Sequence, residues 1–281
     1  MIPAADEAAA RTTSSAPALP ARWADDPFLL DERCWWRPAH LRTDGDALLL
    51  VQRSTSADAT MLVALGPAEP LADLLRAHDD GTHRFAWVET AALDLLHAAD
   101  VTRLGLVPAR TGWEWMVTDT PPAAVAAEAQ VRELDPVADA DAIRACLADA
   151  NPSTDADPEG EGERWWGVSA SPHPGAGGTA RSDSAARLGG TARLGGVIGA
   201  SPRAGRPGGQ GSAHLHGLGV RPGERGRGLG AALTAAAVRG LLADGADWVS
   251  LGMWDDNHGA RRIYHRLGLR TLHRLTTLRR P

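Results

Sequence analysis

The stretch GLGVRPGERGRGLGAAL, residues 217–233, constrains the fold of this chain more than any other part of its sequence. It reads as a short apolar strand, a loop rich in glycine, and an alanine-rich helix that follows directly. The loop glycines are Gly223, Gly226, Gly228 and Gly230. Because glycine loses more conformational entropy on folding than other residues, this density predicts a backbone that approaches a ligand closely or adopts unusual dihedral angles.

A helix that begins directly after such a loop is suited to binding phosphate. Its first N–H groups have no partner within the helix and carry partial positive charge, and small residues let consecutive amides surround an anion. Arg225 and Arg227 add positive charge to the loop. An ordinary surface turn in a glycine-rich chain is the structural alternative.

Two well-known phosphate loops do not fit this stretch. A Walker-type loop requires lysine, and the chain contains none. A dinucleotide fingerprint matches formally at Gly226, Gly228 and Ala231, but the residues RPGER separate it from the strand end. The acidic residue expected about twenty positions later is also misplaced, because Asp255 and Asp256 lie well beyond that distance.

A third loop fits well. The stretch GVRPGERGRGLGAAL resembles the acyl-CoA-binding motif of the GNAT acyltransferase superfamily, Arg/Gln-x-x-Gly-x-Gly/Ala, here over residues 225–230. A second motif follows at the expected distance, because NHGARRIYHRLGLR resembles the family's Asn-x-x-Ala-x-x-x-Tyr helix and the turn after it. The one departure is Leu269, where the family has phenylalanine. The resemblance covers residues 126–281.

The resemblance implies an acetyl-CoA site and assigns roles to particular residues. The amides that hold the CoA pyrophosphate map to Arg225, Gly226, Arg227, Gly228, Leu229, Gly230 and Ala231. The strand backbone that meets the pantetheine arm maps to Leu218, Gly219 and Val220. Asn257 falls on a position that contacts pantetheine, and Tyr264 on the one that protonates the departing CoA thiolate. Alternatively, Tyr264 only packs, because it belongs to an apolar stripe with helical spacing.

The general base is less defined. An alkyl amine has a pKa of roughly 10.4, so presenting it neutral at pH 7 costs about 4 to 5 kcal/mol. Many family members use a glutamate where this chain has His214. His216 lies two residues further, on the same face of the strand, and either imidazole could accept the proton directly or through water. Both could equally be polar residues of a strand near a sheet edge.

Acidic and aromatic residues border the expected acceptor site. They are Glu159, Glu161 and Glu163 before a strand, Asp255 and Asp256 after another, and the pair Trp165 and Trp166. The carboxylates could attract a cationic amine. They could equally be solvated loop residues.

The element order predicts an α/β protein of two GNAT-like domains, each with a mixed, mostly antiparallel sheet flanked by helices. We expect a disordered lead-in at 1–20, a degenerate domain at 21–120, and an acetyltransferase domain at 126–281 with a low-complexity insertion at about 171–190. In the first domain, helices are expected over 70–80 and 91–100. Its phosphate-loop position reads GPAEP, whose prolines lack N–H groups, so CoA binding is not expected there.

These observations predict an N-acetyltransferase that uses acetyl-CoA, acts on a small-molecule or peptide amine by direct attack, and needs no metal. A non-catalytic acyl-CoA-binding regulatory module is the alternative. The net charge of -6 argues against nucleic-acid binding, and no segment predicts a membrane span. Cys34 and Cys146 fit no metal or disulfide spacing and are expected to be packed thiols. We expect a cytoplasmic monomer or homodimer.

Overall fold

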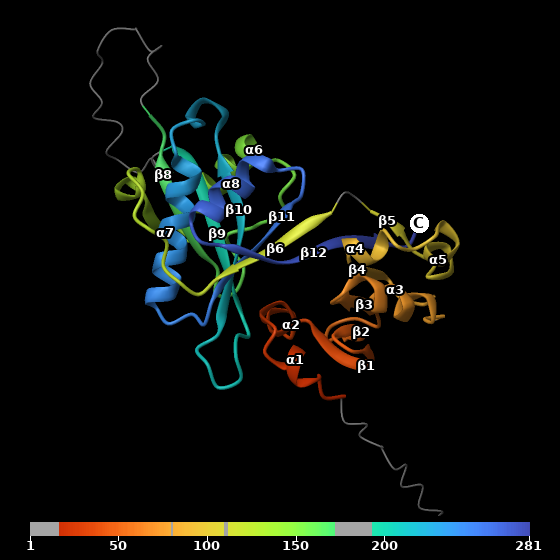
Figure 1. Cartoon of the computed structure of the whole chain (residues 1–281). Coiled ribbons are helices and arrows are strands. Elements are labelled where there is room, and N and C mark those ends of the chain that lie inside the picture. Colours follow the sequence, from red (N-terminus) through yellow and green to blue (C-terminus); the bar gives the residue numbers. More distant parts are fainter. Residues whose placement is uncertain (1–16, 80, 110–111, 172–192) are drawn as a thin grey trace, which may run out of the picture.

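The computed structural model describes residues 17–79, 81–109, 112–171 and 193–281, which form a 12-stranded mixed sheet flanked by helices (Figure 1). The strand order is β1-β2-β3-β4-β12-β6-β11-β10-β9-β8-β7, with β5 paired to β12. Of the predicted lead-in, only residues 17–20 are described, and the predicted insertion at 171–190 lies outside the described residues except for Ser171.

The first half of the chain contributes short helices and five strands besides β6. Its elements are α1 (Ala21–Ala24), α2 (Pro27–Glu32), β1 (Trp36–Asp44), β2 (Ala47–Ser54), β3 (Thr60–Leu65), α3 (Ala68–Arg76), β4 (Phe85–Glu89), α4 (Thr90–Leu93), α5 (Ala98–Arg103), β5 (Val107–Pro108) and β6 (Trp113–Thr118). The helix expected over 91–100 is two helices, because Asp100 accepts a hydrogen bond from the His97 amide and a new helix begins at Ala98.

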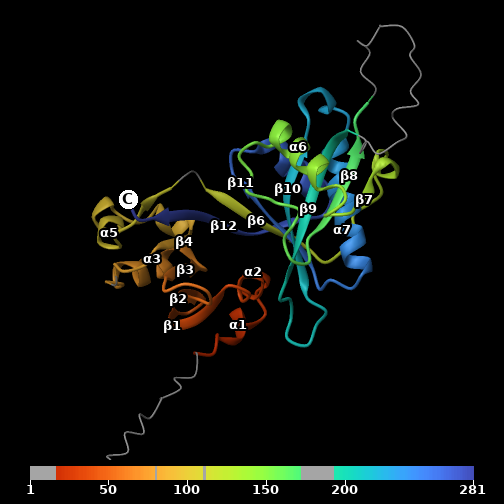
Figure 2. The same cartoon turned by 180° about the vertical axis from the view of Figure 1, so that it is seen from behind.

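The second half forms a more regular arrangement. Its elements are η1 (Glu128–Gln130), β7 (Arg132–Leu134), α6 (Ala140–Ala150), β8 (Arg164–Ser169), β9 (Leu194–Arg203), β10 (Ser212–Val220), η3 (Pro222–Glu224), α7 (Leu229–Ala243), β11 (Val249–Trp254), α8 (His258–Arg266) and β12 (Arg270–Arg279). Helices α7 and α8 cover one face of the sheet, and α6 covers the other (Figure 1; Figure 2 shows the view from behind). None of the helices in the described part of the chain is long and apolar enough to cross a membrane.

Strands β6 and β12 are exchanged between the two halves. Strand β6 comes from the first half but pairs antiparallel with β11, and β12 comes from the second half but pairs antiparallel with β4. The two strands also pair with each other, which makes the sheet continuous (Figure 1). The order β2-β3-β4-β12 repeats the antiparallel, parallel, antiparallel pairing of β9-β10-β11-β6.

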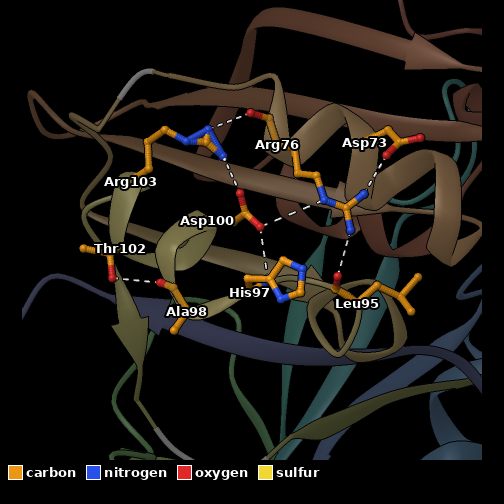
Figure 3. A network of polar contacts seen from close by, with 8 residues as sticks. All are labelled: Asp73, Arg76, Leu95, His97, Ala98, Asp100, Thr102 and Arg103. Carbon is orange, nitrogen blue, oxygen red and sulfur yellow. Dashed lines mark hydrogen bonds and ion pairs between the residues drawn. The ribbon is translucent and has the colours of Figure 1, made fainter.

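A network of ionic contacts fixes the helices of the first half against one another (Figure 3). Arg76 at the end of α3 donates to Asp73 and to the carbonyl of Leu95. From α5, Arg103 donates to the carbonyl of Arg76 and to Asp100. The guanidinium groups therefore bind the exposed carbonyls near the C-terminal ends of α3 and α4, where helix dipoles favour cations.

Buried polar side chains join the two halves. Asp31 in α2 accepts hydrogen bonds from Ser212, Ser250 and Trp248, all of the second half. Burial raises the pKa of Asp31 to about 6, against the opposing effect of these donors. Asp31 is 1% exposed, so leaving it without these donors would carry a large desolvation penalty.

His273 of β12 makes a second such junction. Its Nδ1 lies 2.8 Å from Glu89 and its Nε2 lies 3.1 Å from Asp26, both from the first half. Burial alone would lower the pKa of His273, but these carboxylates raise it to about 9. The imidazole is therefore positively charged at neutral pH and pairs with both carboxylates.

The pH dependence of stability should reveal this charge. Because the folded pKa lies above the ordinary value of 6.5, the ion pairs stabilise the fold fully below pH 6.5, and this contribution disappears as pH rises through 9. The loss should be on the order of 3 kcal/mol. We expect urea unfolding to show this decline in the free energy of unfolding for the wild type. The His273→Gln variant should not show it. His97→Gln, at an exposed histidine, is the control; an equal decline in His273→Gln would contradict the assignment.

Candidate functional site

The glycine loop ends at the start of α7 with backbone amides that have no hydrogen-bond acceptor among the described residues. Gly226 and Gly228 have φ of 79° and 76°, in the left-handed region that favours glycine. A Cβ at either position would meet no atom within 4 Å, so the space beside the loop is open. The first hydrogen bond of α7 runs from the Ala232 amide to the Gly228 carbonyl. Within the described chain, the amides from Gly226 to Ala231 donate to no acceptor, as an anion site requires.

The arginines of this loop already have partners. Arg225 donates to the carbonyls of Val220 and Ala150, which ties the loop to the end of α6. Arg227 forms an ion pair with Glu224. The anion-binding capacity of the loop therefore lies mainly in its backbone amides.

A cavity opens where β10 and β11 separate. Their parallel pairing covers only residues 213–215 and 249–251, and beyond it lies a cavity of about 290 Å³. The predicted site residues His216, Leu218, Asn257 and Tyr264 line it. His214 and the glycine loop do not.

Tyr264 lies in the wall of this cavity. Its side chain packs in the core formed with α7 and is 7% exposed, so the expected packing role is real. Its hydroxyl nevertheless has no hydrogen-bond partner among the described residues. Burial raises the pKa of Tyr264 to about 12, which keeps the phenol protonated at neutral pH. The hydroxyl is therefore available as a proton donor.

Asn257 has a clear structural role at the start of α8. Its Oδ1 accepts a hydrogen bond from the Ala260 amide at 3.1 Å, which caps the helix that carries Tyr264. Asn151 also lines the cavity, and it donates from Nδ2 to the Leu218 carbonyl. Sequence reasoning did not single out Asn151.

His216 is held by a carboxylate. Its Nε2 lies 2.7 Å from Glu163, which also accepts a hydrogen bond from Ser201. Burial would raise the pKa of Glu163, but these two donors hold it below its ordinary value. A proton on Nε2 leaves Nδ1 of His216 as a basic nitrogen, and this buried atom has no partner in the described part of the chain.

Comparisons with known proteins identify the fold that carries this cavity. The sequence profile of the acetyltransferase (GNAT) family matches residues 142–269. This segment is a GNAT acetyltransferase domain. A GCN5-related N-acetyltransferase from Kribbella flavida shares the fold, with a TM-score of 0.52 and 18% identity over 93% of this chain and 95% of that one. A GNAT-family acetyltransferase from Colwellia psychrerythraea aligns with 94% of this chain and 90% of its own chain, at 13% identity and a TM-score of 0.47.

A curated relative matches over a shorter stretch. A mycothiol acetyltransferase of Streptomyces avermitilis is 44% identical over 62 residues. The match spans only 20% of the relative and 22% of this chain. GNAT acetyltransferases use acetyl-CoA, so the open amides and the cavity of the GNAT domain agree with the known chemistry of the family.

The GNAT domain places His214 in a different environment from His216. Its Nδ1 lies 2.9 Å from the Ser250 hydroxyl, which donates to Asp31. Burial, together with the charges of Arg203 and His216, lowers the pKa of His214 to about 3. His214 therefore stays neutral and belongs to the polar junction with α2.

The other predicted acceptor-site residues are separated in the fold. Glu159 pairs with Arg144, whereas Asp255 lines a second cavity of about 340 Å³. Trp165 is fully buried beside His216, and Trp166 packs toward α7. Cys146 is buried, but Cys34 is exposed, so the expectation of two packed thiols is wrong for Cys34. No group of metal-binding side chains occurs in the described part of the GNAT domain or elsewhere in the described chain.

Gly199 makes room for the His216 imidazole. It lies on β9, where it is paired with His216 of β10 on one side and with Trp165 of β8 on the other. A Cβ there would lie 2.7 Å from His216 Cε1 and 2.8 Å from Trp165 Cζ2. The lack of a side chain at residue 199 thus sets the position of the ring.

Substitution of this glycine should therefore destabilise the domain. We expect Gly199→Ala to lower the free energy of unfolding by about 1–3 kcal/mol, because both rings must shift. Gly223→Ala is the control, since a Cβ there meets nothing within 4 Å. Urea unfolding measures both variants, and equal stabilities would contradict the packing argument.

Proposed function

We propose that this chain is an acyl-CoA-dependent N-acyltransferase that moves an acetyl or another short acyl group to a primary amine. The amine attacks directly in a ternary complex, without an acyl-enzyme intermediate. The observation that carries the proposal is the row of amides without acceptors from Gly226 to Ala231, in the loop and helix start that follow β10, the strand that gives His216 to the cavity lined by Tyr264. Together they offer an anion site, a proton donor and a base.

The residues of the GNAT domain that would hold the donor follow from this geometry. The amides at the start of α7 would bind the pyrophosphate, which is favoured by the helix dipole. The segment from Leu218 to Val220 lies beyond the parallel pairing with β11, and its backbone would meet the pantetheine arm. Asn257 lines the same cavity. Bound acetyl-CoA would supply the activated thioester.

Three side chains would carry the proton transfers. His216 Nδ1 would accept a proton from the amine through one water as the new C–N bond forms, because this nitrogen is buried in the described structure. Glu163 fixes the tautomer of His216 and stabilises the imidazolium. As the C–S bond breaks, the protonated phenol of Tyr264 donates to the CoA thiolate, whose reference pKa is about 8.5. His214, with its lowered pKa, is a weaker candidate for the base.

We further propose that the first half is a degenerate GNAT-like domain. Its strands β2, β3, β4 and β12 repeat the pairing of β9, β10, β11 and β6. Its equivalent of the phosphate loop is closed, because a Cβ at Gly66 would lie 2.5 Å from the Asp46 carbonyl oxygen and α3 follows Pro67. This half would then support the acceptor side of the site without binding CoA.

Acetyl-CoA binding should depend on the left-handed glycine before α7. We expect Gly228→Val to reduce acetyl-CoA affinity by about 2 kcal/mol or more, roughly 30-fold, because the side chain covers the amides and strains the loop. Gly208→Val is a matched control in the β9–β10 connection, because Gly208 also has a φ of +76° and a Cβ there would meet nothing within 4 Å. Calorimetry measures the acetyl-CoA affinity of both variants. An equal loss of affinity in the two variants, or no loss in Gly228→Val, would contradict the proposed site.

Tyr264→Phe distinguishes an enzyme from an acyl-CoA-binding regulatory module. In an enzyme, loss of the proton donor should lower kcat by about 10²-fold or more while acetyl-CoA affinity stays the same. Release of CoA thiol in the presence of a panel of primary amines measures kcat, and calorimetry measures binding. Binding without turnover in wild type would favour the regulatory module.

A further inference from the structure

A buried carboxylate of the first half reaches the helix that carries Tyr264. Glu114 lies on the exchanged strand β6, and its side chain is 2% exposed. Its Oε1 lies 2.7 Å from the Arg261 guanidinium on α8, and its Oε2 accepts a hydrogen bond from Thr271. Both carboxylate oxygens are therefore engaged, as burial of a charge requires.

Arg261 connects this carboxylate to the start of α8. Its NH2 group also donates to the Asp255 carbonyl in the turn before the helix, and its NH1 group lies 3.2 Å from His258 Nδ1. Among the described residues, every other side-chain hydrogen bond of α8 stays within residues 255–269. The ion pair with Glu114 is thus the polar side-chain link from α8 to a distant strand.

The position of the Tyr264 hydroxyl depends on how α8 is held. The helix has 9 residues, and Arg261 precedes Tyr264 by about one turn, so the two side chains project from neighbouring faces. The hydroxyl has no polar partner of its own within the described chain, so its position depends on the packing of the ring and on the placement of α8. Proton transfer requires hydrogen-bond reach, and a displacement of about 1 Å can reduce a rate by about 10²-fold.

We propose that Glu114, acting through Arg261, is a positioning residue that sets the place of the Tyr264 hydroxyl at the cavity. This inference rests on the proposed role of Tyr264 as proton donor. The exchanged strand thereby gives the first half a part in the acyl-transfer site of the second half. Glu114 itself does not line the cavity that holds Tyr264 and is not a catalytic residue.

The single tyrosine of the chain allows a direct test. Protein labelled with tyrosine carrying ¹³C at Cζ gives one ring signal, that of Tyr264. In wild type, CoA should shift this signal differently from desulfo-CoA, which lacks the sulfur atom, because the hydroxyl meets the sulfur. In Glu114→Gln, the difference between the two ligands should be largely lost, while CoA affinity by calorimetry changes by less than about threefold, or 0.7 kcal/mol.

Arg274→Gln is the matched control. Arg274 approaches the same carboxylate at 3.7 Å, but it is 69% exposed and lies on β12 rather than α8. It should keep the wild-type response. If Glu114→Gln fails to fold, Arg261→Gln removes the same link from the more exposed partner and should show the same loss.

The outcomes separate the two proposals. A full CoA response in Glu114→Gln or Arg261→Gln overturns the positioning role and leaves the proposed function intact. Equal responses of wild type to CoA and desulfo-CoA, with both bound, overturn the role of Tyr264 and the inference that rests on it. Failure of wild type to bind CoA overturns the proposed function itself.

Discussion

The antiparallel pairing of β6 with β12 holds this molecule together, because each strand comes from one half of the chain and completes the sheet of the other. The pairing fixes the orientation of the halves through backbone hydrogen bonds and leaves no sheet edge between them. The cavity lined by Tyr264 depends on this arrangement, since β11 forms one wall and has β6 as its neighbour. A change in either exchanged strand is therefore expected to affect both halves.

Buried polar contacts give this junction its specificity. Asp31, His273 and Glu114 each bind side chains of the opposite half, and each is at most 5% exposed. A shifted register would leave these groups buried without partners, which is costly in a low-dielectric interior. One of these contacts also reaches the proposed site, because Glu114 pairs with Arg261 on the helix of Tyr264. At Glu114, stability and proposed function thus depend on the same residue.

Local sequence signals predicted the elements of the second half that carry the proposed site. The loop glycines, the helix after them and the cavity position of Tyr264 follow from short motifs whose geometry is set within a few residues. Local patterns do not predict β1, α1 or α2, because the mostly exposed side chains of β1 show no apolar alternation and the two short helices lack helical periodicity. The link between Glu163 and His216 and the exchange of β6 with β12 join segments far apart in the sequence, so no local pattern encodes them.

The exchange also sets the order in which the protein can fold during synthesis. Strand β4 must wait for its partner until β12 has left the ribosome, since Glu89 and His273 lie 184 residues apart. Until then, the first half has an unpaired strand edge beside apolar side chains, the kind of surface that favours aggregation and chaperone binding. Strand β12 therefore completes the sheet of the first half, which should acquire its native pairing only after most of the second half has been made.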